Sequence, residues 1–488
     1  MKSTKRLALS ALVACGLLAA CGSDDETDST TAATEAPASE ATEAPAAEGT
    51  EAPATEETEA PATEATEAPA TEETTGGEAM EGLVDGAIPC EGQYEGETVT
   101  LFSSIRDIEA DRLDKSLAAF EECTGADLQH EGSGEFEAQL KVRIDGGNAP
   151  DIAIIPQPGL MTTLANEGAL VDLGQEQADW VGEHFISGWK ELGEVDGTFY
   201  GSPFGANVKS LVWYNPQMFA EKGYEIPQTW DELLALSDQI VADGGTPWCV
   251  GAESGGATGW VITDWFEDLM LRINGPEVYD QWVAHEIPFN DPQVLAVAEA
   301  AGSILKNPDY IYGGVESIAT TAFQESGLGI LDGSCYLHRQ ASFYGNNFPE
   351  GTELGPEGVA DAFYFPVAKE GDPKVMLGGG ELLSATNDRP VVMDAIRFMS
   401  SADYANARAA EGNWISANKD YDLNNIPNEL DKQFADLLVS SDVFRFDGSD
   451  MMPGAVGAGT FWTEAVAWII GGDTETMLDN IEASWPAS

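Results

Sequence analysis

Basic residues are scarce in this 488-residue chain, where 22 lysines and arginines stand against 85 aspartates and glutamates, and the formal net charge is −63. Proteins hold nucleic acid largely through Lys and Arg contacts with phosphate. A nucleic-acid-binding function is therefore excluded. The acidic surplus indicates a strongly solvated surface, and diffuse charge of this kind does not identify a cationic ligand.

Histidine and the common catalytic motifs are also missing or rare. The sequence has no Gly-x-Ser-x-Gly, no His-Glu-x-x-His and no Gly-x-x-x-x-Gly-Lys, which argues against the enzyme classes built on them. Its four histidines, 130, 184, 285 and 338, are far apart in sequence and form no recognisable cluster. A glycoside hydrolase needs only two carboxylates, so that class remains the alternative in a chain this acidic.

No apolar run after residue 20 is long enough to span a membrane. The one apolar run, residues 7–20, follows Lys2, Lys5 and Arg6 and predicts an export signal over residues 1–20. Residues 18–21, Leu-Ala-Ala-Cys, resemble the lipobox of bacterial lipoproteins. This resemblance implies a lipid on Cys21 and a protein anchored to the extracellular face of the cell membrane. The alternative is an ordinary secretory signal in which Cys21 is incidental.

Residues 21–88 are predicted to form a disordered, acidic tether. From 22 to 81 the chain has no Lys, Arg or aromatic residue, and Thr-Glu-Ala-Pro-Ala recurs five times with a period of eight. Such a segment cannot bury enough apolar surface to offset its ordering entropy, and its prolines and glutamates keep it extended. A solenoid is excluded because no repeat has an apolar face to stack. O-glycosylation of its threonines stays open.

Four cysteines remain after the signal and Cys21. In an oxidising compartment an even number predicts disulfides. Of three connectivities we favour Cys90–Cys123, which would tie the entry of the first strand to the end of the first helix, and Cys249–Cys335 within another domain. No CxxC or Cys/His spacing predicts a metal site.

The folded part begins with a βαβαβ pattern. Strands are expected at 98–103, 126–130 and 150–155, with helices at 109–123 and 136–144 between them, which is typical of a parallel α/β sheet. Ligands in such sheets bind beyond the carboxyl ends of the strands. The loops 103–107, 132–136 and 156–159 should therefore share one rim. Further on, Thr229 and Glu232 predict a capping box, 320–325 a helix and 329–331 a strand.

Several segments together resemble the extracellular solute-binding proteins of bacterial ABC importers, in the maltose-binding-protein-like carbohydrate group (family 1) and nearest to its α-glucoside and oligosaccharide type. Their order and spacing carry the resemblance, more than any one of them. They are residues 146–152 (GGNAPDI), 205–209 (GANVK), 211–215 (LVWYN), 227–233 (PQTWDEL), 333–336 (GSCY), 378–381 (GGGE) and 459–462 (GTFW).

The resemblance implies the two-domain, type II periplasmic-binding-protein-like α/β fold, with a hinge and an interdomain cleft. The first domain would combine 89–208 with 377–415, and the second 209–376 with 416–488. Crossing strands are expected near 205–210 and 366–379. It also implies a non-catalytic receptor, a monomer without cofactor or metal, that delivers a carbohydrate to membrane permease subunits. A signalling partner in place of a permease is a further alternative.

A sugar site needs aromatic platforms together with carboxylates, amides and a few cations. In this family a Trp at the place of Trp462 stacks on sugar. The charged pair near the first strand of malto-oligosaccharide binders is not reproduced at residues 107–108, which argues against maltodextrin. Five other tryptophans, 180, 189, 230, 282 and 468, are expected to pack. The candidate ligand contacts are Glu135, Gln157, Asn207, Trp260, Asp264, Trp265, Asp332, Arg339, Glu381, Trp414 and Trp462.

Overall fold

The first sheet grows from the βαβαβ unit that the sequence predicted. In the computed structural model, which describes residues 82–486, β1 pairs in parallel with β2 and β3. All four residues of β3 are buried, as expected of a parallel strand covered on both faces. The order is β11-β10-β3-β1-β2, and β6 pairs antiparallel with β10. The strands are β1 (Thr98–Ser103), β2 (Asp127–Gly132), β3 (Ile152–Ile155), β6 (Ser202–Val208), β10 (Val375–Ala385) and β11 (Val443–Phe446).

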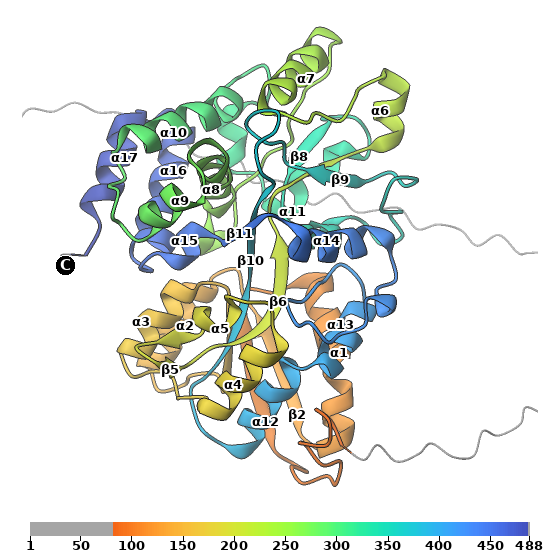
Figure 1. The fold of residues 1–488 in the computed structure, drawn as a ribbon, viewed down its shortest axis with the longest axis vertical. Helices are drawn as coiled ribbons and strands as arrows, with labels where there is room; N and C mark the ends of the chain where they lie inside the picture. The colour runs from red at the N-terminus through yellow and green to blue at the C-terminus, as the bar shows by residue number, and fades with distance from the viewer. Residues whose placement is uncertain (1–81, 487–488) are drawn as a thin grey trace, which may run out of the picture. The chain divides into compact units, whose positions relative to one another are not determined.

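We call this sheet and the helices around it the first lobe (Figure 1). A two-stranded ribbon, β4 (Glu194–Val195) with β5 (Thr198–Phe199), is attached to it. Its helices are α1 (Asp107–Thr124), α2 (Phe136–Asp145), α3 (Pro158–Asn166), α4 (Gln175–His184), α5 (Trp189–Leu192), α12 (Pro390–Met399), α13 (Ala402–Ala410) and α14 (Glu429–Ser440), with the short η5 (Leu423–Asn425).

The second lobe surrounds a three-stranded antiparallel sheet in the order β8-β7-β9. Its strands are β7 (Leu211–Tyr214), β8 (Leu337–Arg339) and β9 (Asp361–Tyr364). Its helices are α6 (Pro216–Lys222), α7 (Trp230–Ala242), α8 (Trp260–Asn274), α9 (Pro276–Val283), α10 (Pro292–Leu305), α11 (Phe323–Ser326), α15 (Gly448–Met451), α16 (Trp462–Ile469) and α17 (Thr474–Ala483), with η1 (Gly255–Ala257), η2 (Val315–Ala319), η3 (Leu328–Ile330), η4 (Ser342–Asn347) and the π-helical η6 (Val456–Phe461).

Three crossings join the lobes. The chain passes from β6 to β7 through Lys209 and Ser210, returns between β9 and β10, and leaves again between β11 and α15. Figure 1 shows β6 and β10 side by side where the lobes meet. Two of these crossings lie in the segments 205–210 and 366–379, where the family resemblance implied them.

Several local predictions are confirmed. Both favoured disulfides, Cys90–Cys123 and Cys249–Cys335, are present. The capping box of Thr229 and Glu232 opens α7.

No helix within residues 82–486 is long and apolar enough to cross a membrane. The predicted signal peptide, Cys21 and the tether up to residue 81 lie outside the described residues.

Other local predictions are wrong. Residues 82–88 were assigned to the tether, but Leu83 and Ile88 pair with each other and are buried in the first-lobe core. The expected strand 329–331 is the short helix η3, because Gly329 turns tightly against the Cys249–Cys335 disulfide. The helix expected at 320–325 begins later, as α11. Within 416–488, β11 pairs with β10 in the first-lobe sheet. Helix α14 lies where the lobes meet, because it contacts β6 and its Phe434 also packs on Trp213 of β7.

Candidate functional site

A cavity of about 150 Å³ lies between the lobes, beside the crossings. The three loops expected on one rim, after β1, β2 and β3, all reach it. Parallel β1, β2 and β3 end at the same edge, which explains why segments far apart in sequence meet here. Its lining residues are Ser104, Ile105, Arg106, Glu109, Gly134, Glu137, Pro156, Gln157, Asn207, Lys209, Ser254, Ala257, Trp260, Phe323, Phe343, Gly379, Gly380, Glu381, Asp447, Asp450 and Trp462.

Aromatic side chains of the second lobe form one wall of this cavity. Trp260, at the start of α8, lies with its ring centroid 5.2 Å from that of Phe323 and 6.1 Å from that of Phe343. Trp462 begins α16, and its indole Nε1 is buried without a hydrogen-bond partner among the described residues. Apolar ring faces of this kind suit the apolar faces of a flat, hydroxylated ligand.

Two amide oxygens in the cavity lining are also buried and unpartnered in the described part of the chain. They are Oε1 of Gln157 and Oδ1 of Asn207. The amide nitrogen of Gln157, in contrast, donates to Oε1 of Glu137 at 3.0 Å. Because burying a polar group without a partner costs free energy, these atoms indicate a ligand that donates hydrogen bonds here.

The carboxyl groups of the cavity differ in their protonation. Burial raises the pKa of Glu381 to about 7, and the neighbouring Glu109 adds to this. Burial likewise raises the pKa values of Glu137 and Asp450. Burial would also raise the pKa of Asp447, but the ammonium of Lys209 outweighs it and holds the pKa at about 2. The cavity therefore offers both neutral and ionised oxygens to a polar ligand.

Glu381 predicts a pH dependence of stability. Its pKa is about 7 in the folded protein, against an ordinary value of 4.5 for a glutamate in the unfolded chain, so the folded state holds more protons between these values. The contribution of Glu381 to the free energy of unfolding is therefore fully present below pH 4.5 and is lost as the pH rises through 7. Relative to wild type, Glu381→Gln should gain stability from pH 5 to pH 8, on the order of 1 kcal/mol after discounting for solvent screening. Thermal unfolding across this range measures it.

The matched control for this test is Glu183→Gln, since Glu183 is exposed on α4. Its melting temperature should follow that of wild type at every pH. A Glu381→Gln curve parallel to wild type would contradict the raised pKa of Glu381.

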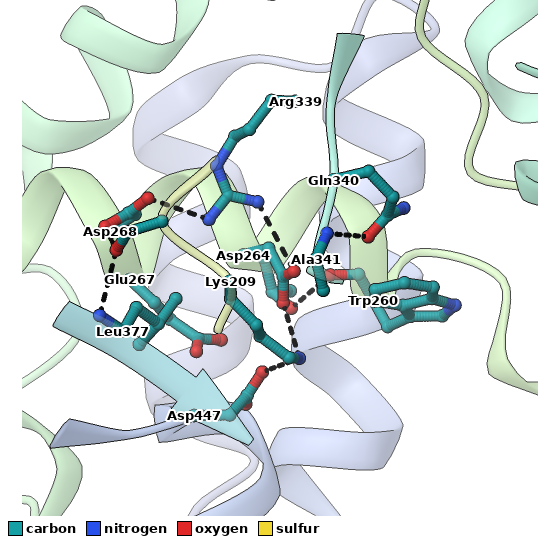
Figure 2. Close-up of polar contacts among 12 residues, drawn as sticks. Lys209, Trp260, Asp264, Glu267, Asp268, Arg339, Gln340, Ala341, Leu377 and Asp447 are labelled. Carbon is teal, nitrogen blue, oxygen red and sulfur yellow. Dashed lines mark hydrogen bonds and ion pairs between the residues drawn. The ribbon is translucent and has the colours of Figure 1, made fainter. Parts of the chain in front are cut away.

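A buried cluster of charges extends from the cavity lining into the second lobe, as drawn in Figure 2. Lys209 donates to Oδ1 of Asp264 at 3.0 Å and also to Oδ2 of Asp447. Burial would lower the pKa of Lys209, but these carboxylates raise it well above its ordinary value. Asp264, Glu267 and Asp447 bring three carboxylate oxygens within 4.8 Å of one another, as a metal site would. Lys209 already supplies the cation, and Glu267 accepts from the amides of Gly448 and Ser449.

Five of the eleven predicted ligand contacts line the cavity. Two others, Asp264 and Arg339, are buried behind Lys209 and bonded to each other. Glu135 lies beside the cavity, where its carboxylate faces Gly255 and Gly256 of the second lobe. The five that line it are Gln157, Asn207, Trp260, Glu381 and Trp462.

The remaining three lie outside the cavity. Trp265 has no exposed surface and packs against Trp248 in the second-lobe core, so it cannot meet a ligand directly. Asp332 lies in a turn near the surface, where it accepts from the amide of Ser334 at 2.9 Å. Trp414 is nearly buried and packs on Phe204. The structure therefore corrects the expectation of ligand contact for Trp265, Asp332 and Trp414, and also for Asp264 and Arg339, which are buried outside the cavity lining.

Several lining residues were missed by the sequence analysis. Glu109 and Glu137 lie in the first turn of α1 and α2, directly beyond the rim loops, and that position was a usable signal. Lys209, Asp447 and Asp450 reach the cavity only because the crossings converge, and nothing in their local sequence indicates it.

Comparison with known proteins agrees with this geometry. The family model of the bacterial extracellular solute-binding proteins matches residues 107–406. The osmoprotective compounds-binding protein GgtB of Synechocystis sp. is 42% identical over 398 residues, which are 81% of this chain and 94% of that protein. The alpha-glucosides-binding periplasmic protein AglE of Rhizobium meliloti is 39% identical over 405 residues, covering 80% of this chain and 87% of that protein.

Solved structures share the fold at low sequence identity. The bacterial solute receptor AcbH superimposes with a TM-score of 0.69 at 18% identity, covering 79% of this chain and 98% of the receptor. A chitin oligosaccharide binding protein superimposes with a TM-score of 0.67 at 20% identity, covering 79% and 97%. The two-lobed, type II periplasmic-binding-protein-like fold is therefore established for this chain.

Proposed function

Because this chain belongs to the bacterial extracellular solute-binding proteins, we propose that it is a receptor that captures an α-glucoside or a short oligosaccharide between its lobes and delivers it to an ABC importer. The single observation that carries the ligand class is the composition of the cavity lining. It combines the rings of Trp260 and Trp462 with the unpartnered amide oxygens of Gln157 and Asn207. Ring faces and hydrogen-bonding atoms are the two things that a sugar requires.

The names of the relatives support the same class. AglE is named for alpha-glucosides and GgtB for osmoprotective compounds. Both align along four fifths of this chain, so the alignment extends over both lobes. The proposed ligand is accordingly small, uncharged and rich in hydroxyl groups.

The proposed receptor acts as a lipid-anchored monomer on the extracellular face of the cell membrane. The basic and apolar start of the sequence and the lipobox at Cys21 support the anchor. The division into 89–208 with 377–415 and 209–376 with 416–488 also remains our proposal for the moving bodies, with β11 joined to the first. Hinge closure about the crossings would exclude water from the bound sugar.

The proposed function is non-catalytic. A lipid-anchored glycoside hydrolase is the alternative, since the cavity holds both neutral and ionised carboxyl groups. The relatives' names describe binding. Prolonged incubation with oligosaccharides should release no reducing sugar, and sustained release would favour the hydrolase.

The direct test is a thermal-shift screen with maltose, trehalose, sucrose and methyl α-D-glucopyranoside, with amino acids and polyamines as controls. Binding to the folded state raises the melting temperature by mass action, and a ligand at 100 times its Kd contributes about 2.7 kcal/mol. We expect a shift with at least one of the four sugars and a matching calorimetric Kd without product. Shifts with polyamines or amino acids alone would overturn the ligand class and leave the fold intact.

A further inference from the structure

Lys209 presents one free ammonium donor to the cavity. Its Nζ bonds to Asp264 and Asp447 and lies 5.2 Å from the ring centroid of Trp260. An ammonium has three N–H donors, and the third has no partner within residues 82–486. Gly379 of β10 makes room for this side chain, because a Cβ there would lie 3.1 Å from Cε of Lys209.

Buried ion pairs continue from Lys209 into the second lobe. Oδ2 of Asp264 accepts from Arg339 at 3.3 Å, and the other Arg339 amine donates to Oδ2 of Asp268 at 3.0 Å. Asp268 also pairs with Arg272, one turn later on α8. All of these side chains are almost fully buried. We call this set, Lys209–Asp264–Arg339–Asp268–Arg272, the ion chain; Figure 2 shows its first four members.

The ion chain is bonded to two of the crossings through Ser210 and Arg272. The hydroxyl of Ser210 donates to Oδ1 of Asp268 at 2.8 Å and accepts from the amide of Leu377 at 2.9 Å, on β10. Arg272 donates to the carbonyls of Phe365 and Pro366 at 2.8 and 2.9 Å, just after β9.

The third crossing is held at the cavity end of the ion chain. Asp447, which accepts from Lys209, donates its own amide to the carbonyl of Gly378 at 2.8 Å. One buried network therefore contacts every crossing between the lobes, and the member of the ion chain that lines the cavity is Lys209.

We propose that Lys209 contacts the bound sugar through its free donor and that the ion chain with Ser210 couples this contact to the crossings, so that capture and lobe closure are linked. The inference rests on the proposed function. Buried charges tolerate few arrangements, because each lost partner is costly. A hydroxyl bonded to Lys209 would therefore favour the one arrangement in which the crossings are held together.

Ser210→Ala tests this link more cleanly than a change at Lys209, which would leave two buried carboxylates unpaired. It removes only the hydroxyl between Asp268 and Leu377. The matched control is Ser237→Ala, since Ser237 is equally buried and its hydroxyl accepts from Trp248 at 3.0 Å, away from the crossings. We expect Ser210→Ala to weaken sugar binding about fivefold and Ser237→Ala to leave the Kd unchanged.

Two readouts are needed. Calorimetry measures the Kd of whichever of the four screened sugars binds wild type. Spin labels on Val142→Cys and Ile470→Cys report the distance between the lobes. Val142 lies on α2 and Ile470 directly follows α16, and both side chains are exposed. We expect the sugar to shorten this distance fully in wild type and Ser237→Ala, and only partly in Ser210→Ala.

The outcomes separate the two proposals. If wild type binds none of the sugars, the proposed function is overturned and this inference falls with it. If wild type binds, and Ser210→Ala matches Ser237→Ala in both readouts, the inference alone is overturned. Weaker binding by Ser210→Ala together with incomplete closure supports it, whereas a lower melting temperature with unchanged Kd and closure would overturn it by assigning Ser210 a purely structural role.

Discussion

Replacing Arg339 with methionine is expected to lower the free energy of unfolding by about 3–5 kcal/mol, the usual cost of removing one partner from a buried charge cluster. Arg339 has no exposed side-chain surface, and the two terminal nitrogens of its guanidinium group pair with Asp264 and Asp268. Methionine has an unbranched side chain that fills similar space, but it removes one of the two cations that pair with each carboxylate and leaves the buried cluster with one cation too few. Denaturation in urea, followed by circular dichroism, measures the loss.

The control for this prediction is Arg389→Met. Arg389 also pairs with two acids, Glu97 and Asp151, but its side chain is 39% exposed. Exposed ion pairs contribute about 0–1 kcal/mol, so this variant should unfold near wild type. Equal losses for Arg339→Met and Arg389→Met would show that burial does not determine how much the ion chain contributes to the free energy of unfolding.

Replacing Trp462 with alanine is expected to weaken sugar binding by about 1–3 kcal/mol while the fold is kept, as the loss of one buried aromatic contact suggests. Trp462 lies in the cavity wall, and its Nε1 is free to donate to a ligand. Both the ring face and this donor would be lost. Calorimetry with a sugar that binds wild type measures the effect, and the melting temperature checks the fold.

Two further variants make the Trp462 test specific. Trp462→Phe keeps a ring but removes the donor, so its affinity should lie between those of wild type and Trp462→Ala. Trp180→Ala serves as the control, because Trp180 stacks on His184 on α4 and does not line the cavity. An unchanged Kd for Trp462→Ala would remove this residue from the site.

The tryptophans of α8 show how far the sequence could predict the site. The sequence analysis proposed both Trp260 and Trp265 as ligand contacts. Five residues correspond to about 500° of helical rotation, so the two rings point to different sides. Trp260 faces the cavity and Trp265 faces the core. Asp264, Asp268 and Arg272 do form a polar stripe on α8, but every residue from Val261 to Arg272 is buried, so this stripe does not mark a side that faces solvent or a ligand.

The sequence predicted more of the fold than of the site. The alternation of strand and helix patterns predicted the βαβαβ unit, and the capping box predicted the start of α7, because these signals are local. The partners of Lys209 were not predictable in this way. Asp264 is 55 residues away and Asp447 is 238 residues away. They meet only when the crossings are assembled, and a buried lysine has the same sequence signature as an exposed one.

Two close approaches between the lobes bear on how long a captured sugar would stay. A Cβ on Gly159 of α3 would lie 1.9 Å from the carbonyl oxygen of Met452, and one on Gly255 would lie 2.8 Å from the carbonyl oxygen of Gly134. The lobes therefore meet closely at two places where only glycine fits. These contacts separate when the lobes open to release a bound sugar. Its residence time would then follow the rate of lobe opening, and receptors of equal affinity could release their cargo at different speeds.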